Sequence, residues 1–561
     1  MSGMPNRVFY RLLYGLFIPT AIYAVVYALF SWPLLGSFST HYFCGHEDGY
    51  QNIWNLWWLN KSVGDLHQLP WYTTWLHYPI GTTLIAHTLA PFNGVIAVPM
   101  RQMGFSLNQA YNAVVVFSFV MSGVTAFWLA WRVGASYVGA LFAGAAFTFC
   151  HFHFAHAQNH LQMVTLEWLP LAVLAVYELL TRPTALKGVG AAGAVLLVAL
   201  SDFHLTFYVV IAGCLLGFVT LARQFNSGFH DVRRFVLPLG LFVLLTAGST
   251  GALAYKLLQV NKTDPLQLNH DPAVWSTDVI DPLIPSAQWR FAELTRSAWG
   301  RLATPDKDFV YVEHSLYVGW ALALLCGWAL FRQRAVGLKD MGYWFGLMAI
   351  FFLLSLGPKL HVAGAVTNFP GIYPVLERIF PPLKMGGVPM RLMIVVSLCA
   401  AVIGGAALGD LVRITGKWKW LAIPLIVLLW TFESLPKAQP ITPAVYPQWV
   451  QALRKLPDGA VIDTSYKDEM QAHLYYATGH GKPVGEGYIS RYPKSVDVRR
   501  GEFRQLVDNW QFDKLRDDWK FRYLVIRLTD GDGRALGELP YKAVFKDDKD
   551  RRMRIYDLTR R

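Results

Sequence analysis

Residues 389–412 read PMRLMIVVSLCAAVIGGAALGDLV, a run of apolar and small residues that follows the single arginine Arg391. About 20 such residues form a helix long enough to cross the hydrocarbon core of a bilayer. Ten further segments have the same character, at 12–34, 108–131, 136–150, 162–181, 187–201, 203–223, 234–256, 314–332, 342–357 and 418–435. The sequence therefore predicts an α-helical polytopic membrane protein with about eleven transmembrane helices.

The composition separates this membrane part from a polar tail. Of all residues, 54% are hydrophobic and only 16% are charged, whereas about 25% are charged in soluble proteins. The stretch from Gln451 to Arg561 alone holds 23 of the 50 Lys/Arg and 18 of the 37 Asp/Glu. We therefore expect a membrane domain over 1–436 and a small soluble α/β domain over 437–561. Its predicted strands are 459–463, 521–527, 542–545 and 553–556, and the last two form a hairpin.

The basic residues predict the orientation. They fall in short connectors between apolar runs, at Arg132, Arg182 with Lys187, 223–234, 332–339 and 413–419. All five connectors lie on the same side of the membrane as the N-terminus if the apolar stretch 89–103 does not cross the bilayer. We therefore interpret 89–103 as a re-entrant or surface-lying helix. Basic connectors mark the cytoplasmic side, so the net charge of +13 does not indicate nucleic-acid binding.

This orientation places loops 35–88, 257–313 and 358–388, and the C-terminal domain, outside the cytoplasm. The expected location is a bacterial inner membrane. Long loops commonly carry function, and the outer face lacks nucleotide cofactors. An enzyme acting there must therefore draw its activated substrate from the membrane.

The first outer loop reads His46-Glu47-Asp48-Gly49-Tyr50 and continues into a tryptophan-rich amphipathic segment. A carboxylate near the membrane surface can act as the general base that deprotonates an acceptor hydroxyl while a phosphate leaves. The alternative is that Asp48 caps the following helix and that Glu47 is simply solvated.

Four histidines mark an outer turn, at positions 151, 153, 156 and 160. The spacing of four puts His156 and His160 on one helical face, which can bind a transition metal. Alternatively, these histidines contact a phosphate or sugar, or they have only a structural role at the membrane boundary.

Three further charged residues lie near predicted outer helix ends. Asp202 joins two apolar segments, where it can position the acceptor or a divalent ion, or only cap a helix. Lys384 and Arg391 precede the 389–412 run, where cations stabilise a leaving phosphate; the alternative is that Arg391 snorkels to lipid phosphates. Loop 257–313, with Lys262, Arg290, Arg296, Glu313 and the adjoining His314, is expected to cover this site.

Several short motifs resemble bacterial membrane glycosyltransferases of the C-type (GT-C) superfamily. They are the acidic residue after the first apolar segment, the tryptophan-rich segment, Tyr78-Pro79-x-Gly81, Ala110-Tyr111-Asn112, 155–161 before Trp168-Leu169-Pro170, Pro389-Met390-Arg391, and 480–488 with Arg491. The resemblance spans nearly the whole chain. It implies a polyprenyl-phosphate-linked sugar donor, inverting transfer, Asp48 as the base with Glu47 as the alternative, and substrate contact by His160 and His156.

The sequence thus predicts a glycosyltransferase that moves a sugar from a polyprenyl-phosphate-linked donor to a glycan or lipid acceptor of the cell envelope. No cofactor is indicated firmly, and a divalent cation stays open. The tail residues His480, Lys482 and Arg491 are expected at the surface rather than in the site. A transporter or flippase of lipid-linked sugars is an alternative, although such proteins usually show internal repeats. A non-catalytic envelope scaffold is another.

Overall fold

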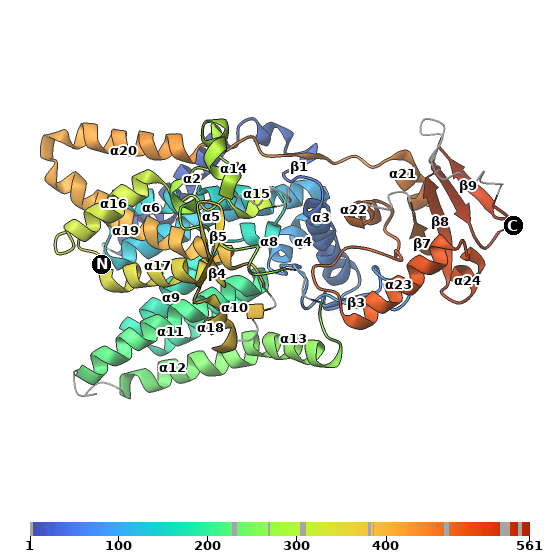
Figure 1. The fold of residues 1–561 in the computed structure, drawn as a ribbon, viewed down its shortest axis with the longest axis horizontal. Helices are drawn as coiled ribbons and strands as arrows, with labels where there is room; N and C mark the ends of the chain where they lie inside the picture. The colour runs from blue at the N-terminus through green and yellow to red at the C-terminus, as the bar shows by residue number, and fades with distance from the viewer. Residues whose placement is uncertain are drawn as a thin grey trace. The chain divides into compact units, whose positions relative to one another are not determined.

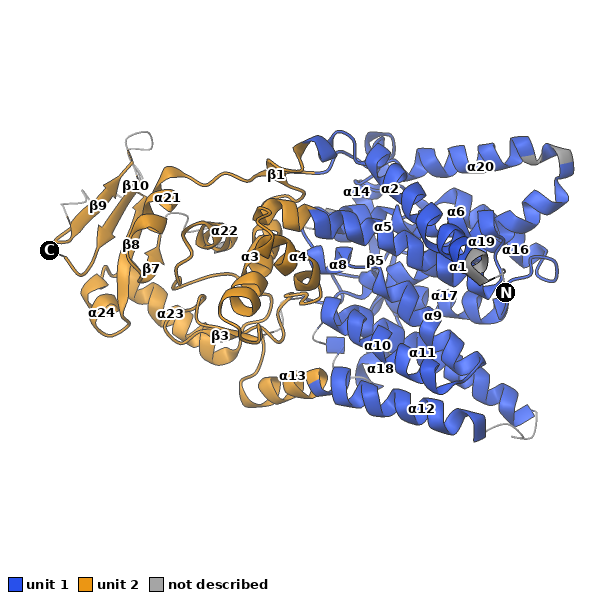
Figure 2. Cartoon of the chain, turned by 180° about the vertical axis from the view of Figure 1, so that it is seen from behind, with its two compact units in different colours: residues 1–36, 113–252, 270–439 blue, residues 37–112, 253–269, 440–561 orange. Residues whose placement is uncertain are grey.

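The computed structural model describes residues 4–226, 233–267, 270–302, 310–379, 383–384, 386–464, 470–527, 539–547 and 553–560. The chain divides into two compact units, coloured separately in Figure 2. Unit 1 comprises residues 1–36, 113–252 and 270–439, and unit 2 comprises residues 37–112, 253–269 and 440–561. Both units are therefore assembled from segments far apart in the sequence. The predicted border between a membrane domain and an outer domain near residue 437 stays a prediction.

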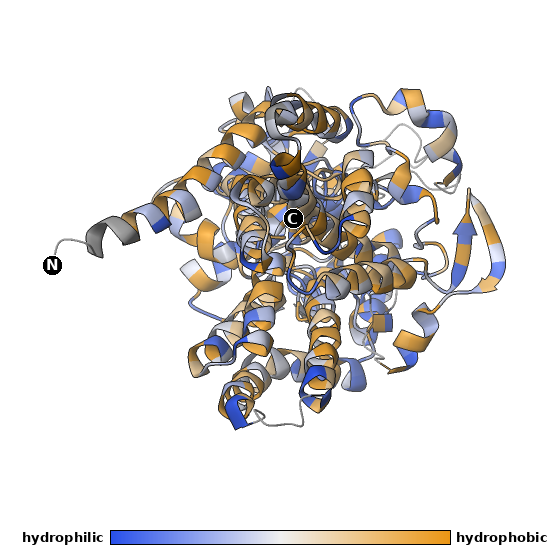
Figure 3. Ribbon diagram, turned by 90° about the vertical axis from the view of Figure 1, so that its left-hand side faces the viewer, coloured by the Kyte–Doolittle hydropathy of each residue, from blue (hydrophilic) through white to orange (hydrophobic). Residues whose placement is uncertain are grey.

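Apolar helices dominate unit 1, and hydrophobic residues run along most of their length (Figure 3). Six helices in the described part of the chain are long and apolar enough to cross a membrane, at Val8–Phe30, Leu107–Val133, Tyr137–His156, Phe203–Asn226, Arg233–Thr263 and Pro389–Ile414. Five shorter apolar helices are Trp168–Thr181, Ala185–Ser201, Trp320–Phe331, Met341–Ser355 and Trp420–Ser434. Each of the eleven predicted segments overlaps one of these helices. A polytopic helical protein is confirmed, and the number of crossings stays a prediction.

Helix α19 (Met393–Ile414) is the core of unit 1. It packs against α6 (Tyr137–Thr148), α16 (Trp320–Phe331) and α17 (Met341–Ser355), as Figure 1 shows. The closest approach is between Gly139 and Gly405, where a Cβ on either residue would collide with the carbonyl oxygen of the other. Small residues at a helix contact let the backbones approach and pack closely in a membrane. The small residues of the 389–412 run therefore serve the packing of the bundle.

Unit 2 contains a four-stranded sheet with the order β7-β8-β10-β9. Strand β7 (Ala460–Asp463) runs parallel to β8 (Phe521–Arg527), and β10 (Met553–Asp557) runs antiparallel to both β8 and β9 (Lys542–Lys546). All four predicted strands and the predicted hairpin are confirmed. Helices α23 (Lys494–Asp508) and α24 (Phe512–Asp517) cover a core that includes Phe503, Leu515 and Phe521.

Residues 37–88, which belong to the first loop predicted to lie outside, fold within unit 2 together with the tail. Strand β1 (His41–Tyr42) pairs with β6 (Thr442–Pro443), and α3 (Asp48–Leu59) packs against α22 (Met470–His480). The predicted surface-lying segment 89–103 contains α4 (Asn93–Gln102), a helix of 10 residues. It is only about 15 Å long, which is too short to cross a hydrocarbon core of about 30 Å.

Candidate functional site

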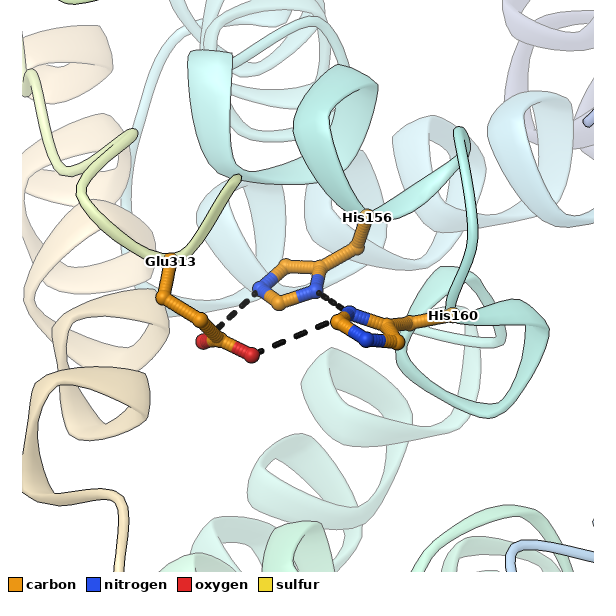
Figure 4. Close-up of side chains that lie close together, drawn as sticks. All are labelled: His156, His160 and Glu313. Atoms are coloured by element: carbon orange, nitrogen blue, oxygen red, sulfur yellow. Dashed lines mark hydrogen bonds and ion pairs between the residues drawn. The ribbon is translucent and has the colours of Figure 1, made fainter. Parts of the chain in front are cut away.

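Two histidines and one glutamate of unit 1 converge at the ends of three helical segments (Figure 4). His156 ends α7 (His151–His156), His160 directly precedes α8 (Leu161–Val164), and Glu313 ends α15 (Val310–Glu313). Each side chain turns one polar atom to the others, and these atoms all lie within 4.8 Å of one another. His156 Nε2 is 3.7 Å from Glu313 Oε2, and His160 Nδ1 is 3.7 Å from Glu313 Oε1. The predicted pairing of the two histidines is thus extended by a carboxylate from a distant loop.

Arg391 binds this carboxylate from the start of the 389–412 run. Its Nε donates to both oxygens of Glu313 at 3.0 and 3.1 Å, and its Nη2 donates to Oε1 as well. The Arg391 residue is 8% exposed and Glu313 is 3% exposed. A buried guanidinium that holds a buried carboxylate does not extend to the headgroups of the surrounding bilayer. The geometry therefore argues against simple snorkelling.

Asp202 lies in the turn between α10 (Ala185–Ser201) and α11 (Phe203–Asn226). Its Oδ1 accepts hydrogen bonds from the backbone N–H groups of His204 and Leu205, at 2.6 and 3.3 Å, and lies 3.0 Å from His204 Nδ1. Asp202 thus caps α11, as the structural alternative predicted. It also acts electrostatically on Arg391, which puts the cap at the edge of the cluster.

The electrostatics of the two buried acids follow from this pairing. Burial by itself raises the pKa of Glu313, but Arg391 and the two histidines outweigh burial and lower it well below its usual value. Burial likewise raises the pKa of Asp202. The charge and hydrogen bonds of His204, together with the charge of Arg391, outweigh burial and lower the pKa below its ordinary value. Both acids are therefore ionised at neutral pH.

The residues present suit a divalent metal ion. His156 Nε2 is buried without a hydrogen-bond partner among the described residues. Imidazole nitrogens and carboxylate oxygens bind zinc at about 2.0–2.2 Å, and two such bonds at an angle span roughly the 3.7 Å that separates His156 Nε2 from Glu313 Oε2. The His156 Nδ1 and His160 Nδ1 atoms lie 2.9 Å apart, within hydrogen-bond distance, and an ion held by His160 Nδ1 would replace this contact.

Asp48 and Glu47 belong to unit 2. Helix α3 begins at Asp48, and Glu47 stands before it at the N-cap position without a capping hydrogen bond from its side chain. Asp48 therefore occupies the first turn rather than the cap. Glu47 has a backbone φ of 55°, a conformation that non-glycine residues rarely adopt and that often accompanies function. Tyr50 stacks between His46 and Tyr475, with ring centroids 5.2 and 4.8 Å away.

Four predicted site residues of unit 1 gather in one cluster, namely His156, His160, Asp202 and Arg391. Lys384 is exposed and acts on Glu377, and in the described part of the chain no hydrogen bond or ion pair joins it to the cluster. Glu313 was expected only as one of several charged residues in a covering loop, and His204 was not expected in the site. Neither stands in a spacing pattern that could have singled it out.

Other polar residues of the same motifs are structural. His153 bonds to the carbonyl oxygens of Thr148 and Val164, at 2.8 and 2.9 Å. His480 and Lys482, which were expected at the surface, are 4% and 3% exposed. The Nζ of Lys482 donates to the Leu456 and Pro457 carbonyl oxygens. Burial here reflects folding of the tail rather than a ligand.

Comparison with known proteins identifies the fold. No protein-family model and no curated protein matches the chain. Among solved structures, the arabinofuranosyltransferase AftD from Mycobacteria matches with a TM-score of 0.54 and 13% identity over 98% of this chain. The match covers 41% of AftD, so this chain spans less than half of that protein's length.

Two other solved structures match with lower scores. The archaeal oligosaccharyltransferase AglB from Archaeoglobus fulgidus has a TM-score of 0.45 and 12% identity, over 92% of this chain and 69% of AglB. ArnT from Cupriavidus metallidurans has a TM-score of 0.39 and 14% identity, over 96% of this chain and 97% of ArnT. The AftD match thus shows that this chain shares its fold with part of that arabinofuranosyltransferase.

Proposed function

We propose that this chain is a membrane glycosyltransferase that moves a sugar from a polyprenyl-phosphate-linked donor to a hydroxyl of a glycan or lipid acceptor on the outer face of the membrane. AftD, which shares the fold, is an arabinofuranosyltransferase, and this makes glycosyl transfer the chemistry to test first. The observation that carries the proposal is the buried cluster of Arg391, Glu313, His156 and His160 in a bundle of apolar helices. Ionisable groups are expensive at membrane depth and are retained there for function.

The cluster suits the phosphate side of the reaction. When the sugar leaves the donor, negative charge develops on the lipid phosphate, and fixed cations that face it lower the barrier. Arg391 is already ordered by Glu313, so its guanidinium needs little rearrangement to donate an N–H to a phosphate oxygen. A divalent ion held by His156, His160 and Glu313 would add positive charge at the same place.

Asp48 suits the acceptor side. We assign it the role of general base, which takes the proton of the acceptor hydroxyl while that oxygen attacks the anomeric carbon and the phosphate leaves. The bond from the sugar to the phosphate breaks, and the new glycosidic bond forms on the acceptor oxygen. Glu47 is the alternative base because it is adjacent and exposed. A single displacement of this kind inverts the anomeric configuration.

The location of the reaction is part of the proposal. The basic connectors favour an orientation in which the loops of unit 2 and the C-terminal sheet face the outer side of a bacterial inner membrane, with about eleven crossings. A flippase of lipid-linked sugars is the rival from a different class. A flippase would need the phosphate-binding cluster but no general base, so Asp48 at the start of α3 would have no catalytic role.

The test uses the full chain in lipid nanodiscs with a panel of synthetic polyprenyl-phosphate hexoses and pentoses. Mass spectrometry follows release of polyprenyl phosphate and the sugar-bearing product in a glycan extract supplied as acceptor. The wild type is compared with Asp48→Asn and with Asp65→Asn, a matched change in the same loop at a side chain that is 51% exposed.

The proposal expects release by the wild type and by Asp65→Asn, and loss of release in Asp48→Asn with the sugar-loaded donor still bound. A wild type that releases no polyprenyl phosphate from any donor contradicts the enzyme. Movement of intact donor between leaflets of a vesicle, at equal rates in the wild type and Asp48→Asn, supports the flippase instead.

A further inference from the structure

One face of α3 is polar and buried. Asp48, Gln51, Asn52 and Asn55 are spaced by three or four positions, which places them on one side of the helix. Gln51, Asn52 and Asn55 are each only 2–3% exposed, whereas Asp48 is half-buried at the end of the row. Buried amides need hydrogen-bond partners, so something polar must cover this row.

The loop around His87 and Thr88 provides that cover. Gln51 Nε2 donates to Thr88 Oγ1 at 2.5 Å, and Asn55 Nδ2 donates to the Thr88 carbonyl oxygen at 2.9 Å. Because the Asn55 amide nitrogen already donates to Thr88, the Asn55 Oδ1 is the atom that faces His87 Nε2, at 2.8 Å. All these bonds are made between segments of unit 2.

His87 continues the network into the tail. The backbone N–H of Ser490 donates to His87 Nδ1 at 3.2 Å, and Ser490 Oγ accepts the Thr88 N–H at 3.2 Å. Since Nδ1 accepts from Ser490 and Nε2 faces an acceptor, the imidazole is neutral with its proton on Nε2. It therefore joins α3 to the tail, and its own partner Ser490 lies 403 positions away in the sequence.

The tail loop that carries Ser490 is itself fixed. Tyr492 Oη donates to the Gly487 carbonyl oxygen at 3.1 Å and accepts the Ile489 N–H at 3.2 Å. A Cβ on Gly487 would lie 2.8 Å from Leu76 and 2.9 Å from Leu474 side-chain atoms, so this loop passes close to the first outer loop. The residue after Ser490 is Arg491, whose place is set by the same bonds.

One negative and one positive side chain act electrostatically on the imidazole. Burial lowers the pKa of His87 to about 3, while Asp48 opposes this shift and Arg491 adds to it. Both charged side chains are thus close enough to act on His87. The hydrogen bonds of His87 thus tie the helix that begins at Asp48 to the tail loop that carries Arg491.

We propose that His87 is a positioning residue that holds the helix of Asp48 against the tail loop, so that Arg491 contacts the same acceptor as Asp48. The inference rests on the proposed function and names the acceptor more closely. A carboxylate takes the proton of one hydroxyl, and a guanidinium with several N–H donors binds neighbouring oxygens. That combination selects an acceptor with adjacent oxygen atoms, which is the chemistry of a sugar.

The test separates positioning from contact by two measurements on the full chain in nanodiscs. Hydrogen exchange reports the amides of 487–492, and donor turnover is measured with octyl glycosides as acceptors. The variants are His87→Phe, His87→Gln and Arg491→Gln, with Lys494→Gln as a matched control at an exposed tail residue. In His87→Gln, the amide can still donate to Asn55.

We expect exchange at 487–492 to quicken about tenfold in His87→Phe, less in His87→Gln, and not at all in Arg491→Gln or Lys494→Gln. Turnover falls about tenfold in His87→Phe and Arg491→Gln, the acceptor KM rises in Arg491→Gln, and the donor KM does not change. Unaltered exchange in His87→Phe, or an unaltered acceptor KM in Arg491→Gln, overturns the inference. A wild type without any turnover refutes the proposed function instead, and hydrogen exchange alone then decides whether His87 holds the tail.

Discussion

Arg391 holds Glu313 by hydrogen bonds from Nε to both carboxylate oxygens, although the two residues are 78 positions apart. Both side chains are buried in unit 1. Removal of one partner from a buried ion pair leaves the other charge without compensation, at a cost of about 3–5 kcal/mol. The pair therefore links the stability of unit 1 to the proposed phosphate site.

Arg391→Gln should lower the free energy of unfolding by about 3–5 kcal/mol and abolish donor binding. Arg413→Gln is the matched control, because Arg413 lies at the other end of the same helix with a side chain that is 65% exposed. Its partner Asp410 is buried but keeps Arg332 and Trp328 as donors, so the loss of the exposed Arg413 side chain should cost only about 0–1 kcal/mol. Thermal unfolding in nanodiscs and binding of a polyprenyl phosphate measure the two effects.

The double variant Arg391→Met with Glu313→Leu separates these two roles. Replacement of both charges by apolar side chains restores much of the stability but leaves no guanidinium for the phosphate. Full donor binding by the double variant would contradict the role of Arg391.

The sequence predicted the helical segments and strands well because their patterns are local. Residues 389–412 are mostly apolar over a length that crosses a bilayer, and strand 521–527 contains the buried apolar run 523–526. Arg391, His156 and His160 could be selected as site residues because each stands at a predicted helix end. Their actual partner, Glu313, lies in a loop without periodicity, so its choice depends on tertiary folding. The union of the first outer loop with the tail through His87 and Ser490 was unpredictable for the same reason.

A divalent cation should bind at His156, His160 and Glu313. We expect about one equivalent of Zn²⁺ or Mn²⁺ in the wild type by elemental analysis, and loss of that ion in His160→Ala, because one of three ligands is gone. The variant His41→Ala serves as control, since His41 lies in β1 of unit 2. Equal metal content in His160→Ala and the wild type would rule out this site, and full activity after EDTA treatment would make the ion dispensable for transfer.

Acid should destabilise unit 2 through its buried neutral histidines. Burial lowers the pKa of His87 to about 3 from the ordinary 6.5, so the unfolded chain binds the extra proton between these values. Stability is therefore complete above about pH 6.5 and decreases as the pH falls towards 3, by about 1.4 kcal/mol per pH unit for each such histidine. His87→Gln should reduce the slope of unfolding free energy against pH by that amount. An unchanged slope between pH 6 and 4 would show that His87 is protonated in the folded state.

Asp48→Asn and Glu47→Gln should differ sharply if Asp48 is the base. A general base contributes roughly 10²- to 10⁴-fold to rate, so Asp48→Asn should lower kcat by that factor. The stability of the Asp48→Asn variant should change little, because Asn has nearly the same shape as Asp and residue 48 is only half-buried. Glu47→Gln should retain most of the rate, since its exposed side chain makes no capping bond to the helix. The opposite order of the two rates would assign the base to Glu47. The strained backbone of Glu47, at φ 55°, would then serve to orient its carboxylate. Equal and complete loss in both variants would instead mean that the two acids act together on the acceptor.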